Sequence, residues 1–126
     1  MSDYIPNLAD AGSNNEIAGV DSLNIYDTAT ANFNAETNVI TYTVPAGKTL
    51  NTDSIEVWGD YFGEWFVRIN GIQKGGTNLS AAERSKSLPY KDAPIAAVAG
   101  DVVTVSIQHQ FMGSVNFHAN LMGRLS

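Results

Sequence analysis

Short segments that alternate apolar and polar residues dominate the last two-thirds of this chain, and they restrict it to an all-β fold. Segment 115–121 alternates over seven residues, and segment 102–109 places Val103, Val105 and Ile107 on one face. The pair Asn70-Gly71 lies between two apolar runs and predicts a tight hairpin, because both residues tolerate a positive φ. The pattern predicts short antiparallel strands and no convincing helix. We expect an antiparallel β-sandwich, jelly-roll-like in its topology.

The stretch from Gly75 to Pro94 lacks this alternation, and we expect it to be irregular. Within it, Ser80-Ala81-Ala82-Glu83 has the form of a capping box, which favours a single helical turn. Leu88-Pro89 would end any helix that began there. Pro45-Ala46-Gly47 and Ala99-Gly100 each place Ala-Gly at the boundary of a predicted strand and predict corners between strands.

Charge divides the chain into two parts. The first 38 residues carry six acidic side chains and no Lys or Arg, whereas the remaining 88 carry seven acids and seven bases. Residues 1–22 are also poor in apolar side chains, which is typical of a segment that cannot close its own core. We predict an extended acidic N-terminal arm over residues 1–37, in which Leu23, Ile25 and Tyr26 could form a short edge strand, and a β-sandwich domain over 38–126. The isolated apolar residues of the arm are its predicted contacts with other subunits: Tyr4, Ile5, Leu8, Ile17 and Val20.

Composition excludes several classes of function. The net charge of −6 argues against a nucleic-acid partner, which would require a basic face. The chain has no Cys, so disulfides and thiolate metal sites are ruled out. No apolar run approaches the ~20 residues of a membrane helix, and the first residues do not resemble a secretory signal. We therefore expect no membrane partner and synthesis in a cytoplasm.

Residue types that bind nucleotides or metals are scattered along the chain. Gly47-Lys48-Thr49 resembles the end of a P-loop, but Tyr42 stands where the first glycine is required. His109 and His118 are the only imidazoles, and they lie on separate predicted strands. Strand alternation places His109 with the core residues and His118 on a polar face, and no spacing supplies a third ligand. We expect no cofactor and no metal.

Acidic pairs are the remaining candidates for catalysis. Asp53 with Glu56, or Asp60 with Glu64, could flank a sugar as acid and base, but nothing in the sequence fixes their separation. Acids at β-turns are common because they accept local backbone hydrogen bonds. We expect no catalytic residues, and so no enzyme.

The densest cluster of aromatic residues spans positions 58–66, where five of nine side chains are aromatic. Alternation sends Trp65 and Phe66 to opposite faces of a strand, so at least one of them fills the core. Trp58, Tyr61 and Phe62 surround a predicted turn and are candidates either for the core or for an interface. Stacking on sugar rings is a third possibility.

Three of the seven bases gather in the predicted long loop. Such a run is usually a solvated face, but an acidic arm or another acidic surface could dock there through weak, salt-sensitive attraction. These further interface candidates are Arg84, Lys86 and Lys91.

Several short segments within residues 38–124 resemble small all-β proteins that decorate the heads of tailed bacteriophages. The resemblance rests on segments 42–50, 66–71, 93–95, 99–105 and 120–123. It implies a capsid decoration (cement) protein that forms a homotrimer, binds the major capsid protein on the virion surface, and reaches neighbouring subunits with terminal arms. The family has no active-site residues to transfer to this chain.

Two other functions remain open. A carbohydrate-binding or receptor-binding module of a phage particle would use Trp58, Tyr61 and Trp65 for stacking. A small glycan hydrolase would depend on Asp60 or Glu64. Deletion of residues 1–35 should abolish capsid binding by a cement protein, whereas a lectin should keep its glycan binding.

Overall fold

Nine β-strands and no helix make up the described part of the protein in a computed structural model, which covers residues 21–90 and 94–126. The strands are β1 (Asp21–Ala31), β2 (Thr37–Thr43), β3 (Thr49–Gly59), β4 (Glu64–Ile69), β5 (Ile72–Asn78), β6 (Ser85–Pro89), β7 (Ile95–Val98), β8 (Val102–Gln108) and β9 (Val115–Leu125). The predicted all-β class is confirmed. Within the same residues there is no helix long and apolar enough to cross a membrane.

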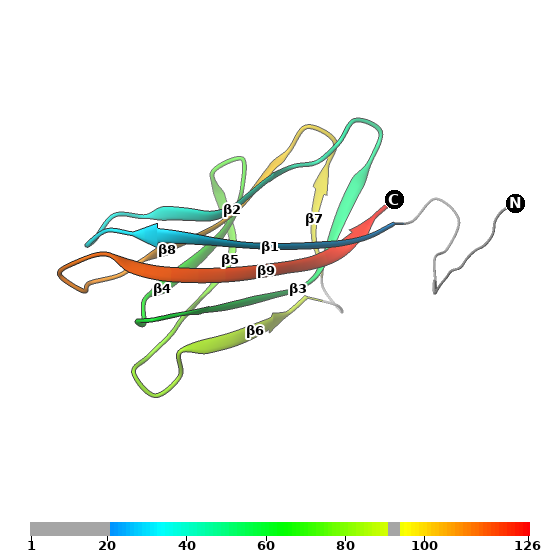
Figure 1. The fold of residues 1–126 in the computed structure, drawn as a ribbon. Helices are drawn as coiled ribbons and strands as arrows, with labels where there is room; N and C mark the ends of the chain where they lie inside the picture. Colours follow the sequence, from blue (N-terminus) through cyan, green and yellow to red (C-terminus); the bar gives the residue numbers. More distant parts are fainter. Residues whose placement is uncertain (1–20, 91–93) are drawn as a thin grey trace, which may run out of the picture.

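The strands form two antiparallel sheets that pack as a β-sandwich (Figure 1). The five-stranded sheet has the order β1-β9-β3-β6, with β7 also paired to β3. The four-stranded sheet has the order β2-β8-β4-β5. The core between the sheets comes from alternate residues of the central strands, as the sequence predicted: Phe117 and Leu121 of β9 and Val105 of β8 are fully buried. Each such side chain contributes about 1.5–3 kcal/mol to folding.

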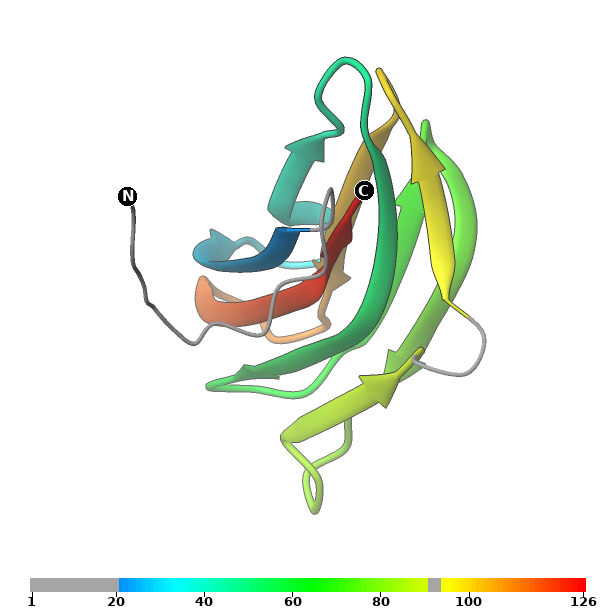
Figure 2. The same cartoon turned by 90° about the vertical axis from the view of Figure 1, so that its right-hand side faces the viewer.

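A bulge at Asp53 lets the long strand β3 serve two neighbours on one edge. Its first half pairs with β7 and its second half with β6, and the register against β9 shifts between Thr52 and Ser54. A bulge bends its strand and increases the local twist, and Figure 2 shows the resulting curvature of β3. The Asp53 carboxylate accepts three hydrogen bonds from Arg124 of β9, at 2.9, 3.1 and 3.2 Å.

The predicted hairpin at Asn70-Gly71 is confirmed. Both residues have positive φ, 52° and 83°, and Ile69 pairs directly with Ile72. The predicted corner before β3 is confirmed as well, since Gly47 has φ 75° and the Lys48 N–H donates to the Pro45 carbonyl at 3.1 Å.

Strand β1 lies within the segment that the sequence assigned to the arm. It pairs with β9 over its whole length, from Asp21 opposite Leu125 to Ala31 opposite Val115. Its inward residues, among them Leu23 and Ile25, pack on the core. Its outward face is mostly polar, so its composition resembles that of an arm although β9 pairs with it along one whole edge. The predicted arm contacts Tyr4, Ile5, Leu8, Ile17 and Val20 lie outside the described residues.

Two acids of the first 38 residues form ion pairs with bases of the sandwich. Glu36 pairs with Arg68 of β4 and accepts a hydrogen bond from Ser106 at 2.7 Å. Asp21 lies 3.8 Å from the Lys48 ammonium. The charge division seen in the sequence is therefore partly neutralised by contacts between its two parts.

The prediction of an irregular stretch over 75–94 was wrong. That stretch contains most of β5 and all of β6, both of which lie at sheet edges and have few apolar residues. Gly75 leaves room for the Tyr90 ring, and partial burial raises the pKa of the Tyr90 hydroxyl. The predicted helical turn is also absent. The Glu83 N–H donates to the Ser80 hydroxyl as in a capping box, at 3.2 Å, but the two residues close a tight reverse turn.

Candidate functional site

One end of the sandwich presents aromatic and apolar side chains on three loops, and we call it the aromatic end. It comprises loops 32–36, 60–63 and 109–114, on the left of Figure 1. Phe33 and Phe111 are each 45 % exposed, and Met112 is 84 % exposed. Tyr61 stacks on Phe62 with ring centroids 4.1 Å apart and lies 5.2 Å from the Phe111 ring. Apolar groups exposed together in this way are typical of an interaction surface.

Asn34 holds two of these loops together. It lies in the left-handed region, with φ 57°, and its N–H donates to the His109 carbonyl at 2.8 Å. Its side-chain oxygen accepts hydrogen bonds from Gln108 and Gln110, at 3.1 and 2.7 Å. The loops that carry Phe33 and Phe111 are thus fixed relative to each other before any partner binds.

His109 supports the aromatic end from below and is fully buried, as strand alternation predicted. The Phe111 N–H donates to Nδ1 at 3.0 Å, which leaves Nε2 as the protonated nitrogen. Nε2 then donates to the Ala31 carbonyl at 2.7 Å. The imidazole therefore joins the end of β1 to the loop after β8.

A cleft of about 220 Å³ opens between the loops of the aromatic end. Tyr61 and Phe111 form its apolar walls, and Asp60, Ser114 and Asn116 form its polar rim. Its size suits one inserted side chain of a partner, the arrangement in which interfaces concentrate their binding free energy.

A second aromatic group lies on the outer face of the five-stranded sheet and joins three strands. Trp58 of β3 lies 5.4 Å from His118 of β9 and 5.8 Å from Tyr26 of β1, measured between ring centroids. The three rings are nearly parallel, with interplanar angles of 12° to 24°. The Tyr26 hydroxyl hydrogen-bonds to His118 Nδ1 at 2.9 Å. We call Tyr26, Trp58 and His118 the aromatic platform.

The other aromatic residues of segment 58–66 belong to the fold. Trp65 is buried and packs edge-on against Phe117, with centroids 5.8 Å apart. Phe66 faces the opposite side of β4 and is covered by the Arg68 guanidinium, 4.5 Å from its ring centroid. Burial of Trp65 removes it from the stacking residues that the sequence suggested.

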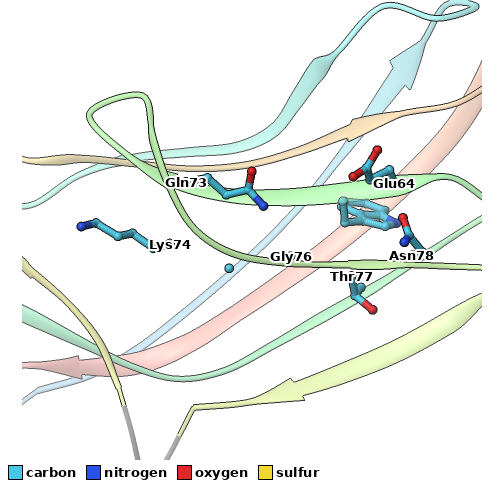
Figure 3. Close-up of a pocket in the computed structure, with 8 residues that line it drawn as sticks. Glu64, Gln73, Lys74, Gly76, Thr77 and Asn78 are labelled. Atoms are coloured by element: carbon cyan, nitrogen blue, oxygen red, sulfur yellow. The ribbon is translucent and has the colours of Figure 1, made fainter.

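An open groove of about 600 Å³ runs along β4 and β5. Two adjacent glycines, Gly75 and Gly76, leave it without side chains at its centre. Glu64 and Gln73 lie on one side of the β5 ribbon, and Thr77 points to the other (Figure 3). The groove has a polar lining that includes Glu64, Lys74 and Asn78.

Two of the three basic interface candidates, Arg84 and Lys86, lie within the described residues. The Arg84 guanidinium donates to the Asp60 carbonyl at 3.3 Å, and Lys86 lies 3.6 Å from the Glu83 carboxylate. Both bases thus have local partners. Lys91 lies outside the described residues.

The acidic and imidazole side chains considered as candidates for a catalytic pair or a metal site lie in different parts of the structure. Asp60 borders the cleft of the aromatic end, whereas Glu64 lines the groove along β5. His109 lies in the core and His118 on the outer face, so β9 separates the two imidazoles. No group of three His, Asp or Glu side chains suited to a metal ion occurs in segments 21–90 and 94–126.

The opposite end of the sandwich has tight turns closed by polar side chains, with Ile72 and Val98 exposed beside them, and we call it the polar end. Asn70 donates from Nδ2 to Asp101 at 2.9 Å and accepts the Val102 N–H at the same distance. The Asp101 carboxylate also accepts the Val98 N–H at 3.0 Å. The hydrogen bonds from Val98 and Asn70 lower the pKa of Asp101 below its usual range.

Sequence reasoning missed four of the residues that form these surfaces. Phe33, Phe111 and Met112 lie in loops, where the spacing of apolar residues does not indicate whether a side chain is buried or exposed. Tyr26 lies on the outward side of β1, and no local pattern indicates that it meets Trp58.

Comparison with known protein families and curated proteins assigns no family to this chain. The sequence matches no protein-family model, and none of the curated proteins compared with it matches.

Proposed function

We propose that this protein is a non-enzymatic attachment module, and specifically a decoration protein of a tailed-bacteriophage capsid. The observation that carries the proposal is the aromatic end, where exposed apolar side chains lie on loops already fixed by hydrogen bonds. The resemblance of residues 38–124 to head decoration proteins supplies the class of partner, the major capsid protein.

Attachment through the aromatic end follows from its physical character. A partner that covers Phe111 and Met112 removes their apolar surface from water. This burial stabilises the complex by about 25 cal/mol per Å². Because Asn34 and His109 already hold the loops, little conformational entropy is lost on binding. The cleft beside Tyr61 accepts one side chain of the capsid protein.

Three finer features belong to the same proposal. The sandwich is jelly-roll-like, the protein acts as a homotrimer, and residues 1–20 are the arm that reaches a neighbouring subunit. Several weak contacts per trimer would then combine through avidity. A sandwich of about 100 residues leaves a larger share of its surface exposed than a bigger domain does, which favours association.

Cosedimentation with undecorated capsid shells tests the proposal. We expect wild-type protein to pellet with the shells and the double variant Phe111→Ser/Met112→Ser to stay in the supernatant. A variant lacking residues 1–20 should bind more weakly. The deletion ends there because removal of residues 1–35 would also remove β1, and with it the partner of β9.

A matched control is Ile72→Ser. Ile72 is 63 % exposed but lies at the polar end, so this variant should pellet like wild type. Equal binding by wild type and the Phe111/Met112 variant would disprove attachment through the aromatic end. A monomer in sedimentation velocity at micromolar concentration would contradict the trimer.

A further inference from the structure

We propose that the aromatic platform is a saccharide-binding site, on which Tyr26, Trp58 and His118 stack against the apolar face of a neutral pyranose. This site is separate from the aromatic end and does not depend on attachment to a capsid. The inference rests on the shape of the platform, its polar surroundings, its small area and its internal rigidity.

The near-parallel arrangement of the rings suits a sugar. A pyranose with equatorial hydroxyls exposes C–H groups on its flat faces, and these carry partial positive charge. The face of an aromatic ring carries the complementary negative charge. With interplanar angles of 12° to 24°, the three ring planes share nearly one orientation, and Tyr26 is the most exposed of the three side chains.

Hydrogen-bonding groups border the rings on the same face of the sheet. Asn120 pairs with Tyr26 on one side and with Glu56 on the other, so all three point outward. Ser85 and Ser87 of β6 lie opposite Trp58 and Glu56. Carboxylate, amide and hydroxyl groups at the edge of a stacking surface are suited to the hydroxyls of a sugar.

One of these groups is an unsatisfied acceptor. The Asn120 side-chain oxygen is buried and has no hydrogen-bond partner among the described residues. A buried polar atom without a partner is rare in proteins and destabilises the fold unless something satisfies it. Rotation of this amide toward a ligand hydroxyl would provide the missing bond.

The size of the platform favours a sugar over a protein partner. A stable protein interface buries about 800 Å² on each side, far more than three partly covered rings provide. Most outward residues around the platform are polar and would gain little from a dry interface, with Met122 of β9 as an apolar exception. The polar neighbours are Thr28, Thr30, Glu56, Ser85, Ser87, Asn116 and Asn120.

Charge selects a neutral ligand. Glu56 is exposed beside the platform, and none of the outward neighbours named above is a base. A sugar acid or a nucleic acid would place its anions near this carboxylate, within a protein of net charge −6. Neutral hexopyranose oligosaccharides meet no such repulsion.

The platform is also fixed before a ligand arrives. The hydrogen bond between Tyr26 and His118 holds two rings in register, and Trp58 stacks against both. Tyr26 remains 57 % exposed. Binding therefore requires little ordering of side chains, which favours affinity.

NMR titration of the full-length protein tests the site, because its two tryptophans report on different places. Cellohexaose, chitohexaose and mannohexaose serve as neutral probes, and hexagalacturonate serves as the anionic probe. We expect at least one neutral probe to shift the indole N–H signal of Trp58 with a Kd on the order of 0.1–1 mM. The signal of buried Trp65 should stay in place, and hexagalacturonate should bind at least about tenfold more weakly.

Three variants locate the ligand. Trp58→Ala should weaken binding at least about tenfold. Because that change could disturb β3, Tyr26→Ala provides a second test at an exposed position, with an expected loss of about threefold to tenfold. Phe111→Ala is the matched control at the aromatic end and should leave the Kd unchanged.

Several results would overturn the proposal. They are no shift of the Trp58 signal at about 10 mM of every neutral probe, binding of the anionic probe alone, or equal affinity in wild type and Tyr26→Ala. Loss of capsid cosedimentation in Trp58→Ala with its fold intact would instead assign the platform to a protein partner. If the variant Phe111→Ser/Met112→Ser binds capsid shells like wild type, attachment through the aromatic end is disproved. The saccharide titration is unaffected by that result, so the two proposals are tested independently.

Discussion

The two ends of this sandwich are built from the same kind of element, a loop between antiparallel strands, but they hold different residues. The polar end has tight turns with glycines at positive φ and a hydrogen-bonded pair, Asn70 and Asp101. The aromatic end has wider loops whose backbone is held by Asn34 and whose apolar side chains point outward. At the polar end, hydrogen bonds between polar side chains stabilise the turns. At the aromatic end, hydrogen bonds of polar side chains fix loops whose apolar side chains remain exposed to water.

This difference separates stability from binding. Substitutions at the polar end should affect the free energy of unfolding and leave partners unaffected. Substitutions of exposed side chains at the aromatic end should have the opposite effect. His109 is the exception, because it lies beneath the aromatic end and supports it. The four predictions below test this division, from the largest expected change in stability to the smallest.

His109→Ala should lower the free energy of unfolding by about 2–4 kcal/mol. The change leaves a cavity and removes the partners of the Phe111 N–H and the Ala31 carbonyl. Urea denaturation followed by tryptophan fluorescence measures the loss. Gln110→Ala, which removes one surface hydrogen bond to Asn34, is the control and should cost less than about 1 kcal/mol. Equal losses in the two variants would show that the imidazole does not support the aromatic end.

Gly71→Ala should cost about 1–2 kcal/mol, because a side chain with φ near 83° is strained. An added Cβ meets no other atom within 4 Å, so the cost is one of backbone conformation and not of packing. Thermal unfolding provides the measurement. A change below about 0.3 kcal/mol would mean that the hairpin turn tolerates another conformation.

Asp101→Asn should remove a pH dependence that wild type shows. The folded-state pKa of Asp101 lies below its unfolded value, so its contribution is present above the unfolded pKa and is lost as the pH falls through the folded pKa. The difference in urea midpoint between wild type and Asp101→Asn should therefore be largest near neutral pH and should shrink as the pH falls below about 4. A difference that stays constant down to pH 2 would contradict this role for Asp101.

Phe111→Ser/Met112→Ser should change the free energy of unfolding by less than about 0.5 kcal/mol, because both side chains are substantially exposed. The same variant should lose binding to capsid shells. Unfolding midpoints and cosedimentation, measured on the same preparation, check the two halves of this expectation. If this variant bound shells normally but had a lower free energy of unfolding, Phe111 and Met112 would contribute to stability and not to binding, contrary to the proposed role of the aromatic end.

Strands with a strict alternation and turns with special φ were predictable from the sequence. Segment 115–121 identified β9 and its buried face, and Asn70-Gly71 identified a turn, because both signals are local. Strand β1 was predicted only as a short edge strand around Leu23, Ile25 and Tyr26, and strands β5 and β6 were not predicted at all. They lie at sheet edges, and their neighbours supply the pairing that their own composition does not indicate.

The candidate sites were harder to predict for a related reason. Alternation placed His118 on a polar face, and position 58 stood out as aromatic, but Tyr26 is 92 residues from His118 in the chain. Such a pairing depends on sheet order, which one sequence does not reveal. Phe111 and Met112 lie in a loop, where no period marks a residue as buried or exposed.

The pairing of β1 with β9 also determines when this protein can fold. β9 is the last strand in chain order, yet it is the central partner of both β1 and β3. During synthesis, β1 leaves the ribosome before β9 does, and the seven strands between them are made before its partner exists. Contacts this distant in sequence slow folding to milliseconds or longer. Until β9 is made, the edges of β1 and β3 stay open to other chains, and the nascent protein is most prone to aggregation at that stage.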